Sequence, residues 1–97
     1  MTAFIIARVL VRDPAKFQEY AQAAGPTIAA HGGKVTQRGK FAEALLGDAE
    51  AHSIGIMEFP DLSSIQAWFS SPDYQALTDL REQAADMELV AYEAPAA

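Results

Sequence analysis

Two ionisable side chains in the sequence, Glu58 and His31, have the chemistry needed for proton transfer. Glu58 lies in the apolar stretch 52–59, where a carboxylate can have a raised pKa and act as a general base. A histidine can act as an acid or a base near neutral pH, and His31 precedes two glycines. Each also has a structural interpretation. Glu58 can pair with Arg8 or another basic group in a dimer interface, and His31 can cap the carbonyls at the end of a helix.

Further residues have the chemistry of ligand contacts. Aromatic rings can form the wall of a small-molecule pocket, and tyrosine hydroxyls can orient a ligand. A guanidinium group such as that of Arg38 can bind a carboxylate. Aromatic residues at helical spacing are, however, more often core residues. The candidate ligand-binding residues are Arg8, Tyr20, Arg38, Trp68 and Tyr74.

Several kinds of site are excluded by residue type and spacing. Cysteine is absent, which removes disulfides, thiolate catalysis and sulfur-based metal sites. His31 and His52 are far apart and lack an adjacent acidic ligand pattern, so no metal site is expected. The six glycines form no dinucleotide or phosphate loop, and the chain has no Gly-x-Ser-x-Gly elbow. We therefore expect no cofactor.

Size and charge limit the range of partners. The chain has 97 residues, 51% of them hydrophobic, which fits a single domain over residues 1–97. The net charge of −6 and the scattered Lys and Arg residues argue against nucleic acid and anionic membranes as partners. No stretch approaches the ~18 apolar residues of a membrane span, and no signal peptide is recognisable. These features favour a cytoplasmic protein.

The first half of the chain reads as a strand, a helix and a strand. In the strand 3–12 one face is wholly apolar, while the other mixes large apolar side chains with Arg8. Asp13-Pro14 is a helix start, and Gly32-Gly33 is expected to end that helix. Gly25-Pro26 is expected to kink or divide it. A second strand is predicted over residues 34–39, with a short continuation or a hairpin arm over 42–46.

The second half repeats this order. The strand 52–59 places Glu58 on the same kind of face as Arg8, and Gly55 on the core face, where it is expected to allow close backbone approach. Pro60-Asp61 opens a short helix. Ser71-Pro72 opens the next helix, whose apolar stripe continues to residue 84, and residues 87–92 form the last strand.

The order β-α-β-β-α-β is that of the ferredoxin-like α+β fold, an antiparallel sheet with helices on one face. The first and third strands are then central neighbours, so Arg8 and Glu58 share the open face and could contact each other. A half-apolar open face would leave apolar side chains exposed to water, which is energetically unfavourable. Homodimerisation through this face is therefore expected.

Short motifs along nearly the whole chain resemble the DUF1330 family. The resemblance implies membership of the dimeric α+β barrel superfamily, in which two open sheet faces pack together and each subunit has a pocket between sheet and helices. The loop 48–53 departs from the usual family pattern. The motifs include Ile6-Ala7-Arg8-Val9, Ala29-Ala30-His31-Gly32-Gly33, Arg38-Gly39, Glu58-Phe59-Pro60, Ala67-Trp68 and Ser71-Pro72-Asp73-Tyr74-Gln75.

The family is itself functionally undefined, and relatives in the superfamily include cofactor-free monooxygenases, isomerases, dehydratases, haem enzymes and stress-response proteins. Fold alone does not choose among these activities. Two functions remain open. One is a homodimer that binds a small, partly apolar organic molecule and could act as a cofactor-independent enzyme for proton transfer, isomerisation or oxygenation, with Glu58 or His31 transferring the proton. The other is a non-catalytic, stress-related or accessory dimer whose polar residues are structural.

Overall fold

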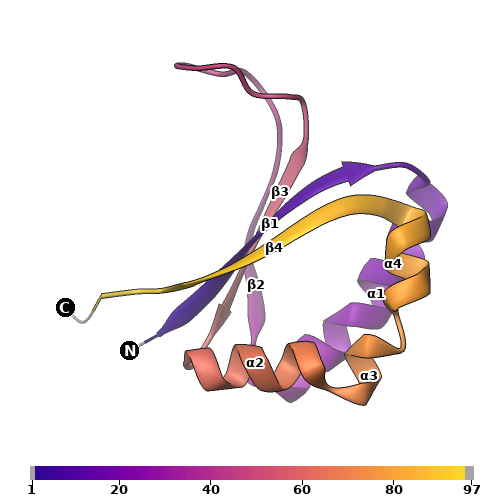
Figure 1. Ribbon diagram of the computed structural model, residues 1–97, viewed down its shortest axis with the longest axis vertical. Coiled ribbons are helices and arrows are strands. Elements are labelled where there is room, and N and C mark those ends of the chain that lie inside the picture. The colour runs from indigo at the N-terminus through magenta and orange to yellow at the C-terminus, as the bar shows by residue number, and fades with distance from the viewer. Residues whose placement is uncertain (1, 96–97) are drawn as a thin grey trace.

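The computed structural model describes residues 2–95, which form an antiparallel sheet with all helices on one face (Figure 1). The central strands are β1 (Ala3–Val11) and β3 (Ser53–Phe59). The edge strands are β2 (Lys34–Lys40) and β4 (Ala85–Glu93), which gives the order β2-β3-β1-β4. The predicted ferredoxin-like plan and its two central strands are confirmed.

The two faces of β1 differ as its sequence predicts. Ala3, Ile5, Ala7 and Val9 are all at most 5% exposed beneath the helices. Their neighbours from position 4 to position 10 are half-buried on the face without helices, which we call the open face. Val11, which alternation assigns to the core face, is 42% exposed because it lies at the strand's end. Alternation in one strand thus separates the subunit core from the open face.

The helix α1 (Pro14–Ala30) begins where the sequence predicts. The Asp13 carboxylate accepts the backbone N–H of Lys16 at 3.1 Å, and proline occupies the first turn. Gly25-Pro26 does not divide the helix, which runs through without interruption. Proline removes a single intrahelical bond. Buried Ala24 and Ile28 on either side keep both turns packed on the core.

Two glycines end α1 for different reasons. Gly32 has φ +77°, and its N–H donates to the Ala29 carbonyl at 3.0 Å. Gly33 donates to the Ile28 carbonyl at 3.0 Å, which completes a Schellman cap. A Cβ at Gly33 would lie 2.6 Å from the Phe59 ring, so this position requires close approach to the core.

The second helical segment consists of three pieces, α2 (Leu62–Ser70), α3 (Pro72–Gln75) and α4 (Thr78–Ala84). The single helix expected after Ser71 is wrong in its middle. There the N–H of Leu77 donates to the carbonyl of Tyr74, three residues earlier, at 2.9 Å. This bond is that of a 3₁₀ turn, which is tighter than an α-helical turn.

An aromatic cluster fills the core beneath these helices. Trp68 is 1% exposed, Tyr74 is fully buried and Phe59 is 2% exposed. The Trp68 ring centroid lies 4.2 Å from that of Tyr74 and 5.7 Å from that of Phe59. Burial of these rings attaches α2 and α3 to the end of β3.

Residues 41–52 form an irregular arm that extends beyond the sheet, away from the helices (Figure 1). The predicted strand or hairpin arm over 42–46 is absent. At the base of the arm the N–H of Phe41 donates to the His52 carbonyl at 2.8 Å. Leu45 and Leu46 are 90% and 97% exposed. These two adjacent leucines form a small apolar surface at the end of the arm.

Candidate functional site

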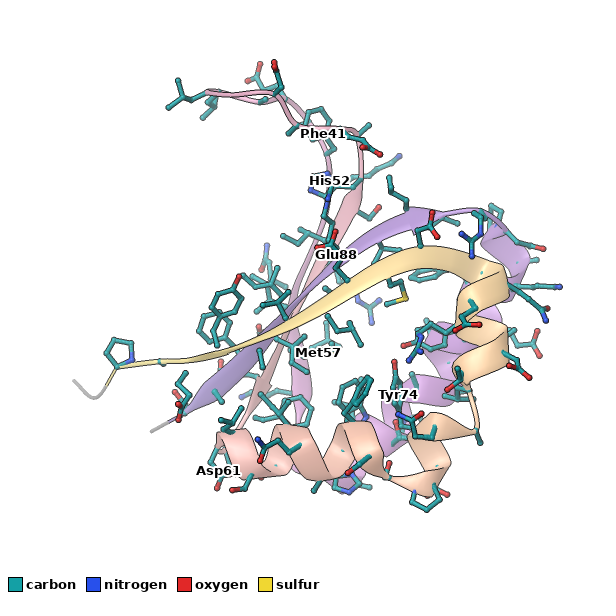
Figure 2. The ribbon with its side chains drawn as sticks, viewed as in Figure 1. Phe41, His52, Met57, Asp61, Tyr74 and Glu88 are labelled. Atoms are coloured by element: carbon teal, nitrogen blue, oxygen red, sulfur yellow. The ribbon has the colours of Figure 1, made fainter. Side chains whose placement is uncertain are left out.

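A cavity of about 460 Å³ lies between the helical layer and the sheet and is open to solvent. Its walls include Tyr20 of α1, Trp68 of α2 and Met57 of β3. Figure 2 shows Met57 in the space between the sheet and the helices. Cavities of this size, mainly apolar with a few polar groups, are typical small-molecule sites. Of the predicted site residues, the cavity brings together Tyr20, Arg38 and Trp68.

Two glycines in the cavity lining leave space that a side chain would fill. A Cβ built on Gly25 or Gly55 would meet no atom within 4 Å. The expectation that Gly55 permits close backbone approach is therefore wrong, because nothing approaches it. A glycine inside a strand costs roughly 0.5–1 kcal/mol relative to alanine. Gly55 therefore carries a cost in stability, and the space that a larger side chain would fill remains part of the cavity.

A bulge in β2 sets which of its side chains reach the cavity. Val35 is opposite Met57 and Arg38 is opposite Gly55, so three positions of β2 cover two positions of β3. The extra residue places Val35 and Arg38 on the same face, which regular alternation would not. Lys40 follows on that face, and all three residues of β2 line the cavity.

Arg38 and Lys40 are exposed residues of the cavity lining, so they mark its solvent side, the mouth, and give it a positive charge. Neither side chain forms an ion pair within residues 2–95. No aspartate, glutamate or histidine from the described part of the chain lines the cavity. The cavity can therefore hold an apolar body and attract a negative group, but the described lining supplies no carboxylate or imidazole for proton transfer.

The polar atoms on the inner wall already have partners. The hydroxyl oxygens of Tyr20 and Tyr74 lie 2.7 Å apart, and Arg81 Nη1 donates to the Tyr74 hydroxyl at 3.1 Å. Trp68 Nε1 donates to Thr27 Oγ1 at 3.0 Å. Figure 2 shows Tyr74 pointing from α3 toward the core, and this residue does not line the cavity. The inner wall is thus aromatic without free donors.

Burial of Tyr20 predicts a loss of stability at alkaline pH. Burial raises the pKa of Tyr20 above its ordinary value of 10.0, and the nearby Tyr74 hydroxyl raises it further. Above about pH 10 the unfolded chain loses this proton while the folded chain keeps it. The folded state is therefore favoured fully below that pH and progressively less above it, by about 1.4 kcal/mol per pH unit.

Chemical denaturation at several pH values measures this effect. Tyr20→Phe should lack this part of the alkaline slope, although it loses some stability at neutral pH with its hydrogen bond. Tyr92→Phe, compared at a protein concentration where the chain is monomeric, is the matched control, because Tyr92 is 44% exposed in the protomer. Equal alkaline slopes for the wild type and Tyr20→Phe would contradict the assignment.

Arg8 and Glu58 share the open face but do not contact each other. Arg8 lies opposite Ile54 and Glu88, and its Nη1 is 3.2 Å from Glu88 Oε1. Glu58 lies opposite Phe4, four positions away from Arg8 along β1, and is exposed. The possible contact between Arg8 and Glu58 is therefore wrong within the protomer. Neither residue lines the cavity.

His31 lies at the end of α1, outside the cavity lining. Its Nδ1 is 3.1 Å from the carbonyl oxygen of Thr27, one turn earlier in the helix. This contact matches the capping interpretation of His31. A catalytic role for His31 or Glu58 stays a prediction, and neither side chain lines the cavity.

Two other kinds of site are absent from residues 2–95. Within that range no group of three or more histidine, aspartate or glutamate side chains is placed to hold a metal ion. No helix among the same residues is long and apolar enough to cross a membrane.

The family model described as "Domain of unknown function (DUF1330)" matches residues 2–95. The chain belongs to the DUF1330 family. The motifs that indicated this family from the sequence include the cap of α1 and the start of α3. No curated protein matches this DUF1330 chain in sequence.

Solved structures share the DUF1330 chain's fold. A Rhodopseudomonas palustris protein of unknown function has a TM-score of 0.82 at 21% identity, covering 99% of this chain and 84% of its own. SnoaB, a cofactor-independent oxygenase from Streptomyces nogalater, has a TM-score of 0.71 at 14% identity, and the match covers 99% of this chain and 95% of SnoaB. A DABB family protein with a ferredoxin-like fold from Mesorhizobium loti has a TM-score of 0.66 at 15% identity, and the match covers 98% of both chains. These identities support the fold alone.

Sequence reasoning missed Gly55 and Lys40 as cavity residues. The occurrence of a glycine among apolar strand residues was a usable signal for a cavity at Gly55. A glycine inside a strand is explained by empty space beside it as well as by close approach of another backbone. Lys40 had no usable signal, since its face depends on the bulge in β2.

Proposed function

We propose that this DUF1330 protein is a homodimer, formed through the open face, that binds a small, partly apolar organic molecule. The observation that carries the proposal is the cavity of about 460 Å³ with the aromatic wall of Tyr20 and Trp68. Because the cavity lies on the helical side of the sheet, pairing of two open faces leaves it accessible.

The apolar character of the open face supports the homodimer. Arg8 and Glu88 form an ion pair on this face. If a second copy covered the face and excluded water, each of these charges would already have its partner, so neither would be buried unpaired. The arm, with exposed Leu45 and Leu46, extends away from the helices and can reach a second copy on that side (Figure 1). The apolar residues of the open face are Phe4, Ile6, Leu10, Ile54, Ile56, Val90 and Tyr92.

The cavity chemistry favours binding over proton transfer. Tyr20 is held neutral by burial, which raises its pKa. The described cavity lining contains no carboxylate or imidazole. The alternative, a cofactor-independent enzyme, is supported by the fold shared with SnoaB. Catalysis by Glu58 or His31 would require the substrate to lie outside this cavity.

A thermal-shift screen with aromatic acids, lactones and phenols tests the binding proposal. A compound that binds at a concentration one hundred times its Kd should stabilise the fold by about 2.7 kcal/mol. Native mass spectrometry of the purified protein provides an independent search for a bound molecule.

Variants of the predicted catalytic residues separate binding from catalysis. We expect Glu58→Gln and His31→Gln to bind cavity ligands within about twofold of the wild type, because neither residue lines the cavity. Loss of ligand turnover in either variant, with binding retained, would instead support the enzymatic alternative. Loss of binding in both would place the ligand elsewhere.

A further inference from the structure

We propose that the cavity ligand is an amphipathic organic acid, whose anionic group is bound by Arg38 and Lys40 at the mouth while its apolar body lies against Trp68 and Met57. This inference rests on the proposed function and specifies the chemical class of its ligand. Phosphate-rich ligands and neutral apolar molecules are the alternatives that the experiment must separate.

The distribution of charge carries the first step. The chain has 13 acidic and seven basic residues, and a net charge of −6. The charged residues described in the cavity lining are nevertheless both cations, Arg38 and Lys40. An overall negative protein repels anions, so a site for an anion needs a local excess of positive charge. The cavity mouth has that excess.

The geometry of β2 supplies the second step. Arg38 and Lys40 are two positions apart on one face of a strand, a spacing of about 7 Å along the backbone. Arg38 faces Gly55, which has no side chain, and Lys40 faces Ser53, whose hydroxyl can also donate. Two long basic side chains at this spacing can converge on one carboxylate.

The inner wall supplies the third step, because it fixes which end of the ligand enters. The Trp68 N–H is already donated to Thr27, and the Tyr20 hydroxyl is paired with that of Tyr74. An anion placed inside would lose its hydration without gaining a free donor. The apolar end therefore enters first, and the acid group stays at the mouth beside the two cations.

A matched pair of fluorescent probes tests this inference. Anilinonaphthalene sulfonate has an apolar body and one anionic group, and N-phenylnaphthylamine is its neutral counterpart. We expect the wild type to bind the anionic probe about tenfold more tightly or better. Added salt should weaken the binding of the anionic probe alone. Naphthoate should displace it at about tenfold lower concentration than naphthalenemethanol, and inorganic phosphate should not displace it.

Charge-removing variants locate the effect. The double variant Arg38→Met with Lys40→Met should weaken the anionic probe by about tenfold and change the neutral probe by less than about twofold. The control double variant, Lys16→Met with Lys34→Met, removes the same net charge from residues outside the cavity lining and should leave both probes unchanged.

The outcomes distinguish this inference from the proposed function. If both probes bind equally and the Arg38 and Lys40 substitutions have no effect, the anionic class is wrong while the cavity still binds apolar molecules. If inorganic phosphate displaces the dye as well as naphthoate does, the ligand class is phosphate rather than an organic acid. If neither probe binds, both proposals fail.

Discussion

Gly55→Leu is expected to weaken ligand binding in the cavity while leaving the free protein at least as stable as the wild type. Gly55 lies in the middle of β3, where its backbone needs no positive φ. A Cβ there would meet no atom within 4 Å. The added side chain should therefore extend into the cavity rather than into the packed core.

The two effects have opposite signs for separate physical reasons. Replacing a strand glycine removes backbone freedom from the unfolded chain, which favours the fold by about 0.5–1 kcal/mol. The same side chain occupies space that the ligand needs, and overpacking of this kind costs about 1–3 kcal/mol, or roughly fivefold to more than one hundredfold in affinity. A stabilised protein with weakened ligand binding would be difficult to explain by misfolding.

Titration with anilinonaphthalene sulfonate and urea denaturation measure the two effects on the same samples. Gly55→Ala is the control, because one methyl group should give most of the stability gain with little loss of affinity. If Gly55→Leu lowers stability and leaves probe affinity unchanged, the space beside Gly55 is not the binding site.

The sequence was sufficient for those parts of the fold that depend on local rules. The buried face of β1 follows from alternation, and the starts of α1 and α3 follow from Asp13-Pro14 and Ser71-Pro72. Burial of Trp68 follows from its position in a helical apolar stripe. Each of these features is decided within a few residues of the chain.

Features that depend on tertiary contacts were not predictable in the same way. The bulge between Val35 and Gln37 depends on pairing with β3, whereas regular alternation would assign Val35 and Arg38 to opposite faces. The break before α4 lies at Leu77, which has no side-chain cap and donates its N–H to the Tyr74 carbonyl. A cavity is defined by absent atoms, and a lone glycine such as Gly55 is compatible with either empty space or close approach.

The contact expected between Arg8 and Glu58 shows the limit of reasoning from faces alone. Both residues are on the open face as predicted, but a face gives no position along the strand. The register places Arg8 beside Glu88 of β4 and Glu58 beside Phe4. Register is set by pairing across the sheet, and it decides which charges meet.

Val90→Glu is expected to dissociate the proposed homodimer, whereas Val11→Glu should not. The two valines are matched, because both lie in strands of the same sheet and both are 42% exposed in the protomer. Val90 lies opposite Ile6 on the open face, and Val11 lies at the end of the other face. Any intrinsic cost of a glutamate in a strand should therefore be similar for the two variants.

Only Val90→Glu would bury an unpaired charge when two open faces meet. Leaving a charge without a partner in an interface costs about 3–5 kcal/mol per site, which corresponds to more than one hundredfold in Kd. Because a symmetric interface contains the substitution twice, the loss should be larger still. Val90→Lys, placed among the same apolar neighbours, should have the same effect, since the cost arises from desolvation and not from the sign of the charge.

Analytical ultracentrifugation across a dilution series measures the outcome. The wild type and Val11→Glu should sediment as dimers at micromolar concentration, and Val90→Glu as a monomer with its fold retained by circular dichroism. A monomeric wild type would overturn the homodimer directly. If Val90→Glu remains dimeric, the two copies associate through another surface, and the exposed Leu45 and Leu46 of the arm become the next residues to substitute, because they are 90% and 97% exposed in the protomer.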